Sequence, residues 1–330
     1  MNPIIGAFIT IFIYPGALFA LVAAVLLGWI RGYARATASG NTNAAPAISF
    51  QEITRRTRQQ SVETEGASFA VTQILIISAI TAPLLALVFM PFPGNNNPSI
   101  TQFPTDAIAE AALLLGMPLS KILLGWVTPS PYTRLAAIRS VRSLLGYIVP
   151  FVYAITVAMA LHGSLTMEGF FTPIPSGTAL HNYIIKFIWL VAGIIFFMCV
   201  PVFTRLTPLR ADFGAIELAA GELTELSGGQ LLVMRAAEAI QTVAFIAFGA
   251  AVFVAPLLSA GGLRAAGFIA ALFIVALLLG IWEGAAPRFR TSEDYMQPAA
   301  IWNNPGLLIL EAAGIFGFFA LHAISAYFHL

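Results

Sequence analysis

The sequence predicts an all-α fold: a polytopic integral membrane protein with about eight transmembrane helices and one amphipathic helix at the cytoplasmic surface. Hydrophobic residues make up 59% of the 330 residues and charged residues only 9%, whereas soluble domains carry about 25% charged residues. The apolar residues gather in long runs, without the apolar–polar alternation of a transmembrane β-barrel. We therefore expect residues 1–330 to form a single transmembrane domain.

The transmembrane spans are predicted from the length of helix that a bilayer requires, which is about 20 apolar residues. Polar connections and turns rich in Pro and Gly separate the apolar runs of this chain. The eight runs that meet the required length are 3–30, 67–91, 104–127, 143–163, 183–203, 232–258, 263–283 and 303–328.

The distribution of arginines predicts the orientation of these spans, because cytoplasmic connections carry an excess of basic residues. Most arginines follow the first, third, fifth and seventh predicted spans, and the loops of the opposite face hold only Arg264. The face with the arginines is therefore predicted to be cytoplasmic, and both termini are predicted to lie on the outer face.

The segment 48–62, ISFQEITRRTRQQSV, differs from the rest of the chain because its few apolar residues stand among Arg and Gln. This pattern is typical of a short amphipathic helix lying at the membrane surface. One interpretation is a solvated linker helix. The other is a collar around an entrance from the membrane, or a docking site for a soluble partner.

The connection 204–230 is predicted to be an acidic cytoplasmic loop. A loop this rich in carboxylates is costly to hold beside lipid, so we expect it to meet water, a proton path or another protein. Glu217, Glu222 and Glu225 would share one side of a helix if the helix were unbroken. A glycine at position 221, however, favours a break in such a helix. The cluster could pass protons, bind basic residues of a partner or simply be solvated. The carboxylates are Asp212, Glu217, Glu222 and Glu225.

Four ionisable residues fall inside the predicted spans or at their ends, all in the cytoplasmic half: Lys121, Glu238, Glu283 and Glu311. Such residues usually face a protein interior or a water-filled path. The predicted depths place Lys121 and Glu238 at one level beneath the acidic loop, so they are expected to pair. The pair could hold two helices together or belong to a proton relay. Asp106, Glu110 and Lys186 lie towards the outer side, where we expect a mostly interfacial role.

Three motifs occur in order along the chain. Residues 125–140, GWVTPSPYTRLAAIRS, are similar to a GW-x-SNSKY-x-LLGALRA loop. Residues 217–228, ELAAGELTELSG, are similar to an E-L-x-x-G-x-x-x-E-Y-S-G loop, and residues 287–296 to an LPR-x-R-YDQLM segment. Together the motifs resemble the proton-channel-like membrane subunit of respiratory complex I and its counterpart in membrane-bound NiFe energy-converting hydrogenases.

This resemblance implies a non-catalytic subunit of the inner membrane that anchors a soluble redox arm and begins a charged path towards ion pumps. Glu217 and Glu225 take the positions of two loop carboxylates of that family, and Arg139 matches the arginine of its first motif. The implied relay comprises Glu217, Glu222, Glu225, Glu238, Glu283, Lys121 and Glu311. The implied docking residues are Arg134, Arg139, Arg142, Arg205, Arg210, Arg288 and Arg290.

The resemblance also implies the partners. They are soluble iron–sulfur and hydrogenase-like subunits, antiporter-like and small membrane subunits, and lipid, with no nucleic acid. The chain itself is expected to hold no cofactor or metal, since its single cysteine, Cys199, lies in an apolar run. Iron–sulfur clusters, together with a NiFe centre or a quinone, are expected in or beside the partner subunits.

The sequence departs from the family pattern at three acidic positions. Ile148 stands where the family has a membrane glutamate, and Phe213 and Ala215 replace acids in the loop. These losses affect the positions of the family's quinone site and proton route. The G-x-LTE-x-SG form of the loop, and Glu283 shortly before the Arg-x-Arg element at 288–290, slightly favour a hydrogenase-related complex. The first alternative is a quinone-reducing respiratory complex I in which the chain completes the quinone chamber. The second is a stand-alone secondary transporter, against which the halves of the chain share no motif.

Overall fold

The computed structural model describes residues 17–40, 68–90, 105–171, 179–206, 223, 225–258 and 261–285. Within these ranges every regular element is a helix, and seven helices are long and apolar enough to cross a membrane, which confirms the predicted all-α membrane class. They are α2 (Ala17–Ala38), α4 (Phe69–Phe89), α5 (Asp106–Val127), α6 (Pro131–His162), α7 (Ala179–Phe203), α8 (Gly228–Gly249) and α9 (Gly261–Ala285). The predicted surface helix 48–62, most of the acidic loop and the eighth span 303–328 lie outside the described residues.

Some helices extend beyond the predicted spans at their polar ends. The fourth span was predicted from residue 143, yet α6 begins at Pro131, a residue suited to the first position of a helix because it needs no amide donor there. Likewise α2 ends at Ala38 rather than at residue 30. Hydropathy delimits the stretch that lipid can surround, whereas arginine and alanine continue a helix into the polar region.

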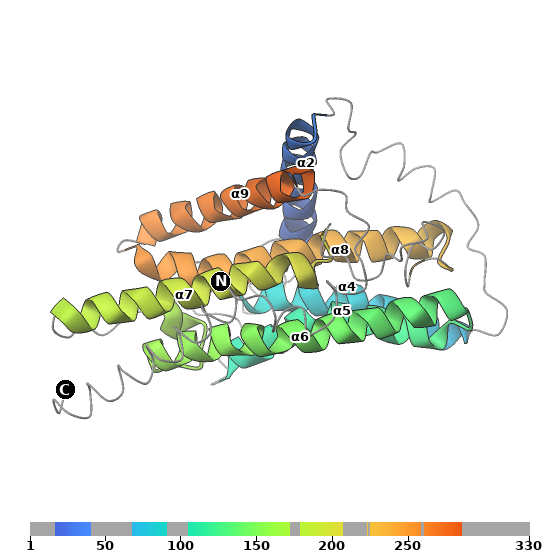
Figure 1. Cartoon of the computed structure of the whole chain (residues 1–330), viewed down its shortest axis with the longest axis horizontal. Coiled ribbons are helices and arrows are strands. Elements are labelled where there is room, and N and C mark those ends of the chain that lie inside the picture. Colours follow the sequence, from blue (N-terminus) through green and yellow to red (C-terminus); the bar gives the residue numbers. More distant parts are fainter. Residues whose placement is uncertain are drawn as a thin grey trace, which may run out of the picture.

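Helix α8 lies at the centre of the described fold and packs against α2, α4, α5, α7 and α9 (Figure 1). Its residues from 240 to 249 are all buried. Aromatic rings tie it to its neighbours: the Phe203 ring of α7 stacks on Phe245 of α8 at 5.4 Å and meets Phe151 of α6 edge-on at 5.1 Å. In Figure 1, α2 runs across the direction of the other long helices.

The predicted sixth span, 232–258, is not one continuous α-helix. After α8 the chain forms a π-helical turn, η3 (Ala250–Val254), and then a 3-10 turn, η4 (Ala255–Leu257), which contains Pro256. Proline has no amide hydrogen to donate, so the helix geometry changes around it. The indole Nε1 of Trp189 on α7 donates to the carbonyl oxygen of Phe253 at 3.1 Å, which satisfies one acceptor of the irregular turn.

Helices α2 and α9 approach each other closely where small residues face one another. A Cβ added at Gly280 would lie 2.5 Å from the carbonyl oxygen of Arg31, and one at Gly284 would lie 2.5 Å from that of Arg35. Spacing of small residues by four allows such close backbone contact between membrane helices. Beside this contact, Arg31 pairs with Glu283 at 3.4 Å.

We expect Gly280→Ala to lower the melting temperature of the protein in detergent, because its methyl group would meet backbone that cannot rotate away. Overpacking of this kind costs about 1–3 kcal/mol. Gly262→Ala is the matched control, since it lies on the same helix and its added Cβ would meet nothing within 4 Å. Equal melting of the two variants would contradict the close contact.

Candidate functional site

The candidate site is an ion cluster between α5 and α8. The Nζ atom of Lys121 lies 2.6 Å from Oε1 of Glu238, and the guanidinium of Arg235 lies 3.0 Å from Oε2 of the same carboxylate. The predicted Lys121–Glu238 pair is therefore formed. The side chain of Lys121 is 0% exposed and that of Arg235 is 36% exposed, so Glu238 connects a buried cation to one that reaches the surface of the chain.

The apolar surroundings of the cluster come from the same helical faces. Met117 and Leu124 stand four residues before and three residues after Lys121, so they share its buried face on α5. On α8, Met234 stands four residues before Glu238 and Ala237 directly precedes it, and all four apolar side chains belong to one buried hydrophobic cluster. Because these residues keep water away from Lys121, the charge of the lysine depends strongly on its acidic neighbour.

A second polar contact between the two helices lies two turns before Lys121, towards the N-terminus of α5. Pro118 lacks the amide hydrogen that would normally bond to the carbonyl oxygen of Leu114 in the helix. The side-chain amide nitrogen of Gln241 on α8 donates a hydrogen bond to that carbonyl instead. Gln241 is fully buried, so a helix defect in α5 and a glutamine in α8 together form a specific contact inside the membrane domain.

Arg235 was not among the residues that sequence analysis singled out. The signal was present, because an Arg and a Glu three residues apart lie on the same side of a helix. Hydropathy concealed it by assigning both residues to one predicted span. With Arg235 included, the cluster holds two cations and one carboxylate within the described residues.

The turn that carries Glu225 lies against this ion cluster. Leu223 and Leu226, on either side of the carboxylate, are buried in the same hydrophobic cluster as Met117 and Met234. Glu225 itself is half-buried and precedes the start of α8 at Gly228. The two leucines therefore fix the end of the acidic loop over the α5–α8 contact, so the predicted neighbourhood of loop and pair is present.

Glu283 is not part of this cluster. It was predicted in the same relay, but its side chain is 7% exposed and pairs with Arg31 of α2. In Figure 1, α9 and α5 lie on opposite sides of α8. The ion pair of Glu283 thus belongs to the α2–α9 contact, and α8 separates it from Lys121.

The arginines predicted after the third span lie on a helix rather than in a loop. Arg134, Arg139 and Arg142 occupy the first turns of α6, with Arg134 and Arg142 exposed and Arg139 half-buried. A continuous helix places them at fixed spacing along one end of the domain. Their docking role remains a prediction.

Arg205 ends α7 in an unusual backbone conformation. Its φ of 54° is left-handed, and the amides of Arg205 and Leu206 bond back to Val202 and Pro201 at 3.1 and 2.8 Å. Glycine usually occupies this capping position, because a side chain there is strained. Keeping an arginine at this position therefore points to a use for its side chain.

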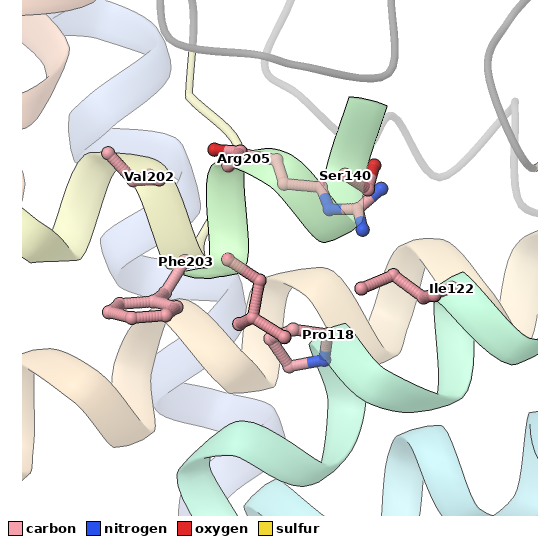
Figure 2. A pocket seen from close by; sticks show the side chains of 8 residues that line it. Pro118, Ile122, Ser140, Val202, Phe203 and Arg205 are labelled. Carbon is pink, nitrogen blue, oxygen red and sulfur yellow. The ribbon is translucent and has the colours of Figure 1, made fainter. Parts of the chain in front are cut away.

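The side chain of Arg205 extends towards Ser140 beside a small cavity between α5, α6 and α7 (Figure 2). The cavity has a volume of about 20 Å³, and Ser143 and Pro118 also line it. A cavity of this size is sufficient for one water molecule. Arg205 therefore faces the membrane domain.

Two groups of predicted site residues remain. Glu217, Glu222, Glu311, Arg210, Arg288 and Arg290 lie outside the described residues. Asp106 and Glu110, for which an interfacial role was expected, are 3% and 0% exposed. That expectation was wrong for both, because α5 turns the face that bears them towards neighbouring helices rather than towards water. Among the described residues no three His, Cys, Asp or Glu side chains group to hold a metal ion.

Comparisons with known proteins extend over nearly the whole chain. A sequence model of the family described as NADH dehydrogenase matches residues 8–304. A solved structure of the membrane-bound sulfane sulfur reductase, an archaeal respiratory membrane complex, contains a chain of similar fold with a TM-score of 0.69 and 20% identity. The similarity covers 94% of this chain and 99% of that chain. No curated protein matches the sequence.

A double-mutant cycle would test whether Lys121 and Glu238 stabilise the fold as a pair. We expect Lys121→Met and Glu238→Gln together to destabilise the protein less than the sum of the single changes, with a coupling of about 0.5–3 kcal/mol. The measurement is the stability of each purified variant in detergent. As a control, Lys121→Met and Glu283→Gln should be additive, because Glu283 pairs with Arg31. Strict additivity of the first pair would show that the contact contributes no stability.

Proposed function

We propose that this chain, which belongs to the NADH dehydrogenase family and is a membrane-arm subunit of a complex I-like oxidoreductase, docks a soluble iron–sulfur arm and couples electron transfer there to ion translocation. The protein would act in the inner membrane beside antiporter-like and small membrane subunits. The family assignment does not support the alternative of a stand-alone transporter.

The observation that carries the coupling role is the placement of Glu238. Its two carboxylate oxygens contact different cations, one buried and one partly exposed. A new charge placed near Arg235 would therefore alter how strongly Glu238 attracts Lys121, because the Glu238 carboxylate interacts with both cations at once. The turn that carries Glu225, held by the buried Leu223 and Leu226, brings a further carboxylate to the same contact.

The docking role is supported by the basic first turns of α6. Arg134 and Arg142 are exposed, and Arg139, which matches the family motif, lies between them. Rigid presentation of arginines suits recognition of carboxylates on a partner, because each guanidinium forms paired hydrogen bonds. Only residues 128–130 connect α5 to α6, so these arginines lie near the end of α5.

A hydrogenase-related complex is slightly favoured over a quinone-reducing one. The glutamate that the family places at position 148 is an isoleucine here, and that residue lies within α6. One groove of the described residues is lined mainly by apolar side chains of α7 and α9, and none of the predicted relay residues lines it. The similar solved chain belongs to a complex named for sulfane sulfur reduction, which supports an acceptor other than quinone.

We expect Glu238→Gln to reduce the number of ions moved per electron while electron transfer continues, because the amide cannot carry the carboxylate's charge. The measurement is ion uptake by proteoliposomes containing the whole complex, with electron transfer recorded in parallel. Glu225→Gln is expected to act in the same direction and more weakly. Lys186→Gln, at an exposed position on α7, is the control. Unchanged coupling in Glu238→Gln would contradict the relay role.

Purification in mild detergent would test the partners. We expect the chain to be recovered with soluble subunits that contain iron and acid-labile sulfide, and with nickel if the complex is hydrogenase-related. Iron without nickel, together with quinone-dependent activity, would instead favour the respiratory alternative. Recovery of the chain alone, or as a homo-oligomer free of metal, would contradict the docking role.

A further inference from the structure

The first half of α5, which is predicted to lie towards the outer face, carries a second pair of ionisable residues that the ion cluster does not include. Asp106 and Glu110 stand one helical turn apart, so their side chains lie on the same face. Asp106 is held in place by the backbone amide of Met167, which donates to its Oδ1 at 2.8 Å. The amide of Ala107 donates to the carbonyl oxygen of Leu165, so the segment after α6 closes this end of α5.

Glu110 has an unusual environment for a carboxyl group. The residue is 0% exposed, and neither of its side-chain oxygens has a hydrogen-bond partner among the described residues. Buried polar atoms without partners are rare in proteins and often indicate a bound water, an ion or a functional group. An isolated carboxylate in an apolar interior is so costly that such groups take up a proton instead.

The helices that pack around Glu110 offer little positive charge. The whole of α4 lacks ionisable residues, and the part of α8 that follows Glu238 in the sequence also has none. The second half of α6 contributes two tyrosines, Tyr147 and Tyr153, and His162 at its end. Glu168 and Asp106, near the closed end of α5, would add negative charge. A proton is therefore the cation that this arrangement can most readily supply to Glu110.

Gln241 of α8 lies between the Lys121–Glu238 pair and the Asp106–Glu110 pair along the direction of α5. Its amide nitrogen bonds to the carbonyl oxygen of Leu114, one turn from Glu110, while its Oε1 is buried without a partner among the described residues. Lys121, Leu114 and Glu110 lie along one face of α5. The distance from Lys121 to Asp106 along the helix is about 22 Å at 1.5 Å per residue, most of the hydrocarbon thickness of a bilayer.

We propose that Glu110 holds an exchangeable proton and that Asp106 and Glu110 form a proton-binding site in the outer half of the domain, reached from Lys121 past Gln241. Glu110 releases its proton towards Asp106 and the outer face, becomes a carboxylate transiently, and takes up a replacement proton from the side of Gln241. The path through this site rests on the proposed function, whereas the presence of the proton on Glu110 does not.

Infrared spectroscopy of the whole complex in membranes would test the proton directly. We expect the spectrum of the wild type minus that of Glu110→Gln to show the carbonyl stretch of a protonated carboxylic acid, shifted in heavy water. Glu168→Gln should leave this band in place. The band's absence from the difference spectrum would overturn the proposal. Glu110→Asp, which keeps a carboxyl group, serves as the second variant if the glutamine variant does not assemble.

Ion translocation by the same variants would test the path. We expect Glu110→Gln to lose most translocation per electron while electron transfer persists, and Glu110→Asp to recover part of it. A residue needed only for packing or hydrogen bonding would be replaced well by glutamine, so wild-type translocation in Glu110→Gln would overturn the path. If the wild-type complex translocates no ions, the proposed function fails, and the infrared band still decides whether Glu110 holds a proton.

Discussion

The buried positive charge of Lys121 is the constraint on which the centre of the fold depends. Taking an ammonium group out of water costs several kcal/mol, and the cost is recovered only if a partner is held at close range. Glu238 therefore requires α8 to pack on α5 in one register, and the Gln241–Leu114 contact favours the same register two turns away. Burial of the surrounding apolar side chains is stabilising but non-directional, so these polar contacts select which of several helix packings is adopted.

Proline residues within the membrane helices provide some of the specificity that charges cannot. Pro118 frees a carbonyl oxygen in α5, and Pro256 accompanies the irregular end of α8. In lipid a free backbone carbonyl must find a donor inside the protein. Gln241 and Trp189 supply donors at these two places, so each helix defect becomes a contact point with a neighbouring helix.

Sequence analysis predicted the helical membrane class and the Lys121–Glu238 pair, because both follow from one-dimensional signals: apolar length, and the depth of a charge within a span. It located helix ends poorly, as in α6, since hydropathy does not register where backbone hydrogen bonding stops. It also missed Arg235 and assigned Glu110 to an interface. Which face of α5 is buried depends on the positions of α4, α6 and α8, and the sequence of α5 alone does not contain them. Glu283 was grouped with Lys121 by depth, although α8 lies between them.

The contact between α2 and α9 has a consequence for how the protein is made. Its glycine seam and its Arg31–Glu283 ion pair join the first and the last of the described membrane helices. During synthesis Arg31 enters the membrane region long before Glu283 leaves the ribosome, so α2 has to wait without its partner charge. A helix in that state favours the interface, where arginine can remain hydrated. We therefore expect docking of α2 to be a late event in biogenesis, and its crosswise direction is compatible with a helix that joins a bundle already assembled around α8.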